Sequence, residues 1–194
     1  MLLRLARLHV VSHRVPAALG LLTALGAMLW AALYGRWSIA GGSAAQQVVP
    51  LVIETGAAAV VAVTGEGPFG GQERTAGRWV PWLRLGAAVL LTGTVVVALS
   101  ALAMAGGLTG GVLAMSRHVA GIAGVGLLSA AVLGGVFAWA CPMAYLLITE
   151  GALAAGWTTP WVWTARPSND LGAALCATLV FAAGTAVITV RGSR

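Results

Sequence analysis

Lysine is absent from this sequence, and charge of either sign is scarce. The 194 residues carry only 11 basic side chains, all of them arginine, and 5 acidic ones. A soluble domain has about 25% charged residues, whereas this chain has 8%. Without lysine the chain cannot form a phosphate-binding loop of the G-x-x-x-x-G-K-S/T type, so any work driven by a nucleotide requires a partner chain.

The motifs of hydrolytic and metal chemistry are missing as well. His9 and His13 lie in the N-terminal segment, His118 lies at the start of an apolar run, no H-E-x-x-H motif occurs, and the five acidic residues never pair closely. Hydrolysis within a membrane would need a Ser–His pair, paired carboxylates or His/Glu metal ligands on facing helices. Cys141 and Cys176 both fall inside apolar runs, which is typical of small packing residues. We therefore expect no enzyme, no metal and no cofactor in this chain.

The placement of the positive charge also argues against a nucleic-acid partner. The net charge is +6, but the arginines stand singly or in threes beside apolar runs rather than on one surface. This pattern is typical of topology signals and of contacts with lipid headgroups.

Apolar residues are what the sequence has in quantity, with 59% hydrophobic residues and a mean hydropathy of +0.93. Uncharged runs of about 17 to 25 residues recur along the chain, the length that crosses a bilayer as a helix. The sequence therefore predicts an all-α membrane protein whose residues 1–194 form a single transmembrane domain. The expected spans are residues 15–34, 48–64, 85–105, 119–134, 136–150 and 171–190.

The number of spans depends on residues 119–149, an apolar run of 31 residues. A single spanning helix needs about 20, and Gly134 and Gly135 near the middle favour two short helices joined by a tight turn. Six spans with a cytoplasmic N-terminus put 8 arginines inside and 3 outside, whereas five spans give 7 and 4. Since arginine concentrates on the cytoplasmic side, six spans with both termini inside are preferred.

The N-terminal segment, residues 1–14, is too charged to span a bilayer. Arg4, Arg7 and Arg14 fall within an arc of about 80° on a helix, which predicts an amphipathic helix lying at the membrane surface. The alternative is a secretory signal peptide. The apolar stretch that follows, residues 15–35, is too long for the core of such a peptide, so we expect the segment to be retained.

The most polar internal stretch is residues 65–84, between the second and third expected spans. Within it, residues 72–78 offer about two turns of polar helix, and Trp79 and Trp82 would anchor the return to the membrane. This segment is either a binding surface for a soluble partner on the cytoplasmic side or an ordinary solvated loop. Its residues alone favour neither.

Glu54 is the only acidic residue well inside an expected span. A charged side chain at mid-membrane costs about 2.5–3.5 kcal/mol, so such residues usually face a partner or a wet cavity. Glu54 could contact a substrate, a proton path or another subunit. Alternatively, it is protonated or hydrogen-bonded to a neighbouring helix such as one bearing Ser or Thr, and this second interpretation is slightly preferred.

The segment at residues 150–168 is rich in tryptophan and proline. We expect it to dip into the outer leaflet rather than extend into water. It could serve only as an interfacial aromatic belt, or it could cap the outer end of a translocation path.

Taken in order, these features resemble the membrane subunit of a type-2 ABC exporter. They are the amphipathic N-terminal helix, six spans, a polar segment between spans two and three, a semi-apolar re-entrant region between spans five and six, and a short basic tail. The stretches Pro68-Phe69-Gly70, Glu73 to Arg78, and Phe181-Ala182-Ala183-Gly184 through Arg191-Gly192 are similar to small actinobacterial-type permeases.

The resemblance implies a permease in the plasma membrane of a bacterium, paired with a second permease subunit, identical or different, and with P-loop ATPase subunits that bind ATP and Mg. Residues 67–78 would form the coupling helix that docks into the ATPase, and Glu73, Arg74 and Arg78 would be its docking charges. Two different interpretations stay open, a membrane protein that assembles or regulates another complex and a proton-coupled transporter that uses Glu54. The residues expected to form the ATPase-docking segment are Phe69, Gln72, Glu73, Arg74 and Arg78.

Overall fold

The computed structural model describes residues 15–34, 42–64, 80–105, 111–157 and 159–191, and within these ranges it contains helices and turns but no strand. The expectation of an all-α fold is therefore confirmed over this part of the chain. The helices are α2 (Val15–Tyr34), α3 (Gly42–Thr64), α5 (Val80–Ala105), α6 (Gly111–Leu133), α7 (Ala140–Ala154) and α8 (Leu171–Arg191), with short 3-10 turns η1 (Gly135–Phe137) and η2 (Trp163–Ala165).

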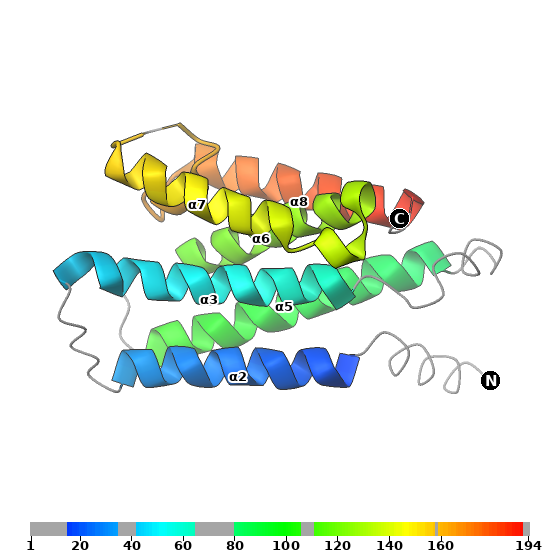
Figure 1. The fold of residues 1–194 in the computed structure, drawn as a ribbon, viewed down its shortest axis with the longest axis horizontal. Coiled ribbons are helices and arrows are strands. Elements are labelled where there is room, and N and C mark those ends of the chain that lie inside the picture. The colour runs from blue at the N-terminus through cyan, green and yellow to red at the C-terminus, as the bar shows by residue number, and fades with distance from the viewer. Residues whose placement is uncertain (1–14, 35–41, 65–79, 106–110, 158, 192–194) are drawn as a thin grey trace.

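The α-helices run alternately in opposite directions along the long axis of the molecule (Figure 1). Consequently α8 ends at the end of the bundle where α2 begins, and α6 and α8 run parallel to each other. Helix α6 is the centre of the bundle, because it packs against α3, α5, α7 and α8, and most extensively against α8. Helix α2 lies at the periphery and packs mainly on α3 and α5.

Four segments of the described chain are long and apolar enough to cross a membrane, and a shorter apolar helical segment covers Leu51–Thr64. Their large apolar side chains face outward: Leu90, Leu147 and Leu179 are exposed. A surface of this kind is stable against lipid rather than water, so the fold indicates a membrane-embedded protein. The six-span layout stays a prediction. The four segments are Arg84–Leu102, Val112–Leu133, Gly135–Ala152 and Leu171–Val190.

Three of the observed helices begin before the expected spans, and one of them, α5, begins at Val80 rather than at residue 85. Helix α3 begins at Gly42 rather than at residue 48, and α6 begins at Gly111 rather than at residue 119. The sequence places Arg117 and His118 in the connection before the fourth span, because both are polar. In the structure both lie within α6 and find partners inside the bundle, which allows the helix to continue through them.

The chain breaks between α6 and α7 at Gly134. This glycine has φ 93°, a left-handed backbone conformation that residues with a Cβ rarely adopt. The following turn η1 is tied to α6, because the Ser129 hydroxyl donates to the carbonyl of Phe137 at 2.9 Å. The glycine pair at residues 134 and 135 thus reverses the chain and sends α7 back along α6.

Small residues bring α6 and α8 into backbone contact. A Cβ added at Gly124 would lie 2.6 Å from the Phe181 Cα, and one added at Gly184 would lie 2.5 Å from the Gly124 carbonyl oxygen. Such close approach increases van der Waals contact between the two backbones, which is the main attraction available to helices in lipid. The parallel α6–α8 pair therefore depends on glycine at both positions.

Replacing Gly124 with alanine should lower stability by about 1–3 kcal/mol, because the methyl group collides with a backbone that cannot rotate away. The matched control is Gly93→Ala on α5, where an added Cβ meets nothing within 4 Å; it should be neutral or stabilising by up to about 1 kcal/mol. Unfolding of both variants in detergent measures the difference. Equal stability of the two variants would refute the close α6–α8 contact.

Candidate functional site: a buried polar network at one end of the bundle

The centre of the network is a pair formed by Glu54 of α3 and His118 of α6. The Nδ1 atom of His118 lies 2.8 Å from the Glu54 Oε2 atom, and the side chains are only 14% and 5% exposed. One proton shared between the two groups satisfies both atoms. A buried carboxylate is tolerated here because its partner comes from a second helix.

A hydrogen bond between Glu54 and a neighbouring helix is the slightly preferred interpretation of the sequence. A contact with a neighbouring helix is observed, but the partner is a titratable histidine rather than Ser or Thr. Leu51 and Ala58, one turn to either side of Glu54, belong to the same buried cluster as Ile122 of α6. The pair is thus enclosed by apolar side chains on the face that α3 presents to α6.

Arg117, the neighbour of His118, holds the loop that follows α7. Its Nη1 atom donates to the carbonyl of Pro167 at 2.8 Å, and its Nη2 atom donates to the carbonyl of Arg166 at 2.7 Å. These charge-assisted bonds join α6 to residues about 50 positions away. The guanidinium therefore fixes where the loop enters α8.

Asp170 fixes the start of α8 itself. One carboxylate oxygen accepts a hydrogen bond from the backbone N–H of Ala173 at 3.0 Å, and the other bonds the Arg166 guanidinium. The Ala173 N–H and the Arg166 contact hold the pKa of Asp170 below its ordinary value of 3.8. Asp170 is thus an ionised N-cap, and it is favoured further by the positive end of the helix dipole.

Aromatic side chains insert the middle of the loop into the bundle. Trp163 is buried and stacks on Tyr145 of α7, with ring centroids 4.6 Å apart, and the Tyr145 hydroxyl donates to the carbonyl of Trp161 at 3.0 Å. A Cβ added at Gly121 of α6 would lie 2.6 Å from the Trp163 ring. Because Gly121 has no side chain, the Trp163 indole can pack directly against α6.

These contacts establish that the loop folds back between the helices. Gly121 lies ten residues after the start of α6 at Gly111, which is about 15 Å along the helix. Turn η2 accordingly packs against α6, α7 and α8 together. Within residues 150–168, Val162 and Trp163 are buried, whereas Trp157 and Trp161 are exposed, and the expectation that the segment dips into the outer leaflet stays a prediction.

Several polar atoms around this loop are buried without a hydrogen-bond partner among the described atoms. They include His118 Nε2 and Arg117 Nε on α6, Glu150 Oε1 on α7 and Trp163 Nε1 in η2. Nearly all buried polar groups in proteins are paired, with water or a ligand where no protein group is available. Because these unpaired polar atoms lie on α6, α7 and η2, which pack together, we take this end of the bundle as the candidate functional site.

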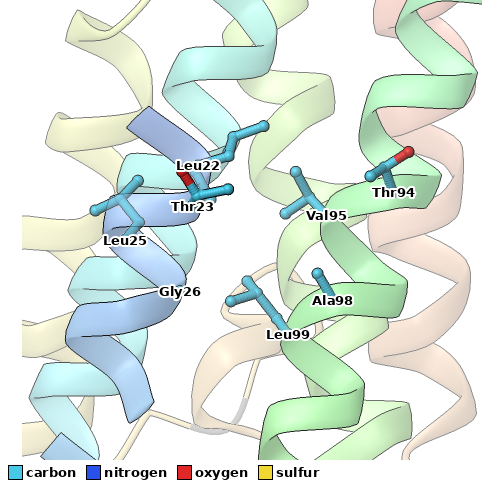
Figure 2. A pocket seen from close by; sticks show the side chains of 9 residues that line it. Leu22, Thr23, Leu25, Gly26, Thr94, Val95, Ala98 and Leu99 are labelled. Carbon is cyan, nitrogen blue, oxygen red and sulfur yellow. The ribbon is translucent and has the colours of Figure 1, made fainter. Parts of the chain in front are cut away.

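An apolar cavity of about 120 Å³ lies between α2 and α5, away from this network (Figure 2). Leu22 and Leu25 line one side, and Val95 and Leu99 line the other. Its hydroxyl groups are already paired within their own helices, because Thr23 donates to Gly20 and Thr94 donates to Leu90. This cavity offers no free polar atom, so it is suited to hydrocarbon rather than to chemistry.

Of the expected site residues, only Glu54 belongs to the described ranges. The expected interfacial helix and the expected coupling segment both lie outside them. Within the described ranges, no group of three His, Cys, Asp or Glu side chains could hold a metal ion. The residues outside the described ranges are Arg4, Arg7, Arg14, Phe69, Gln72, Glu73, Arg74 and Arg78.

The sequence did not identify Arg117, His118, Tyr145, Trp163 or Asp170 as parts of one site. The available signal was the adjacent Arg-His pair at the start of an apolar run, which predicts either a loop or a buried polar site. Comparisons with known proteins do not help to decide, since no protein-family model, curated protein or solved structure matches this chain.

The Glu54–His118 contact can be measured with a double-mutant cycle. Either Glu54→Ala or His118→Ala leaves a buried partner unpaired, at a cost of about 1–3 kcal/mol. The double variant should lose less than the sum of the two, with a coupling free energy of about 0.5–3 kcal/mol. The control combines Glu54→Ala with Thr178→Ala on the exposed side of α8, and these two effects should add. Additive losses in the first cycle would contradict the contact.

Proposed function

We propose that this chain is the transmembrane permease subunit of an ATP-binding cassette exporter, working as a dimer and powered by a separate ATPase. The observation that carries the proposal is the segment between α7 and α8, which folds back among the helices and is held there by Arg117 and Tyr145. A re-entrant region before the last of six helices is the layout implied by the resemblance to type-2 exporters. The alternating helix directions agree with it (Figure 1).

The energy source in this proposal is a partner chain. The sequence has no lysine and hence no phosphate-binding loop of its own. Helix α3 ends and helix α5 begins at the end of the bundle where α8 finishes (Figure 1). A coupling segment in the connection between α3 and α5, with Phe69, Gln72, Glu73, Arg74 and Arg78 toward the ATPase, would therefore share a membrane side with the basic C-terminal tail.

The orientation follows from the distribution of arginine. With the α3–α5 connection and both termini in the cytoplasm, 8 of the 11 arginines lie inside, as expected for a bacterial plasma membrane protein. The re-entrant loop and its polar network then lie toward the outer side. There they would close the far end of a path formed with a second permease subunit.

The coupling segment can be tested by charge reversal. Glu73→Arg and Arg78→Glu should each lower the ATP turnover that the permease stimulates in its co-purified ATPase, by about tenfold for the loss of one interface charge pair. Arg194→Glu in the C-terminal tail is the matched control and should leave turnover unchanged. If the ATPase binds and turns over equally well with both reversals, the coupling assignment is wrong. If no ATPase co-purifies with the wild-type chain, the exporter proposal fails.

A second candidate function is proton-coupled transport through Glu54. The buried Glu54–His118 pair favours it, because two titratable groups in contact within a membrane are typical of proton relays. In that case transport in vesicles runs on a pH gradient without any ATPase, and Glu54→Gln abolishes it. In the exporter, transport requires ATP and is not driven by a pH gradient alone.

A further inference from the structure

A cavity of about 530 Å³ lies between the first halves of α6 and α8, beneath the end of the re-entrant loop. Its lining covers Leu113 to Ala120 on α6 and Leu171 to Thr178 on α8, a length of roughly 10 Å on each helix. Leu113 and Leu171 are 63% and 78% exposed, so the cavity opens on the outer, lipid-facing surface of the bundle. We call it the α6–α8 groove.

The loop end of the groove is polar and positively charged. Arg117 lines it and is only 5% exposed, yet both acceptors that it bonds are backbone carbonyls and its Nε atom has no partner. Asp170 also lines the groove, and it is neutralised by Arg166, which lies just outside the lining, so these three side chains together carry one net positive charge. A buried cation without a carboxylate in contact is costly unless an anion approaches it.

Helix geometry adds to this charge. Helices α6 and α8 run parallel, so both N-termini lie at the loop end of the groove (Figure 1). The dipole of each helix contributes a partial positive charge at its N-terminus, which at α8 is already partly met by the Asp170 carboxylate. The side chains of Ser168 and Asn169 line the same end; the Ser168 hydroxyl donates to Asn169 Oδ1 at 3.2 Å, and the Asn169 amide NH2 offers further donors.

The rest of the groove is mainly apolar, and its two hydroxyl groups, of Ser116 and Thr178, already bond carbonyls of their own helices. Its floor consists of Ala120, Ala174 and Ala177, with Leu113 and Leu171 at the rim. A ligand that fits must therefore combine an anionic group with a hydrocarbon chain running along α6 and α8. The volume and the exposed opening both favour an amphiphile that enters sideways from a bilayer.

We propose that the α6–α8 groove binds a phospholipid whose headgroup carries a net negative charge. The phosphate lies at Arg117 and Ser168, and one acyl chain lies over the alanine floor. A zwitterionic lipid is disfavoured, because its ammonium group would face the net positive charge at Arg117. This inference requires membrane embedding but does not depend on the exporter function, since lipid binding is measured without an ATPase.

The test uses the full chain purified in detergent and its thermal unfolding with added lipid. Phosphatidylglycerol should raise the Tm by roughly 2–4 °C by binding the folded state. Phosphatidylcholine and inorganic phosphate should each raise it much less. An equal rise with phosphatidylcholine would overturn the preference for an anionic headgroup, and an equal rise with inorganic phosphate alone would show a free-anion site instead of a lipid site.

Variants locate the lipid without altering Arg117. Ala174→Leu fills the groove and should abolish the rise with phosphatidylglycerol, whereas Ala183→Leu, on an exposed part of α8 outside the groove, should keep it. Ser168→Glu, which adds a negative charge at the headgroup position, should also abolish the rise, and Ser168→Thr should preserve it. A full rise in either Ala174→Leu or Ser168→Glu would refute the site.

Discussion

The close contact between α6 and α8 is the constraint on which the other features depend. Gly124 and Gly184 allow the two backbones to touch at a point where any added Cβ would lie within 2.7 Å of the opposite helix. Because these helices run parallel, the chain between them must return along α7 (Figure 1). The parallel pair thus brings both helix N-termini and the α7–α8 loop to one end of the bundle, where Gly121 leaves room for Trp163.

The polar network follows from that geometry. A loop that enters an apolar bundle brings backbone carbonyls which must be hydrogen-bonded. Arg117 serves two of them, the Tyr145 hydroxyl serves a third, and Asp170 satisfies the first turn of α8. The arginine is therefore buried for a structural reason, and its remaining positive charge is a consequence that a ligand or a transport cycle can use.

The fold class could be predicted from the sequence because apolar runs and glycine pairs act locally. The helix break at Gly134 lies at the glycine pair that favours it, since a left-handed residue is required there. The Glu54–His118 contact could not be predicted, because it joins residues 64 positions apart and depends on how α3 packs against α6. For the same reason the expected fourth span, residues 119–134, left Arg117 out: its hydrogen-bond acceptors lie in a segment that only the tertiary fold brings near it.

The central claim is that Val162 and Trp163 of the α7–α8 loop are buried within the bundle, and cysteine labelling tests it most directly. In a chain with Cys141 and Cys176 replaced by alanine, Val162→Cys tests a side chain that is 0% exposed and Thr159→Cys tests an exposed one. In native membranes a membrane-impermeant maleimide should label Thr159→Cys and leave Val162→Cys protected, with both labelled after denaturation. Labelling of Val162→Cys as fast as Thr159→Cys would contradict the re-entrant loop and the network built on it.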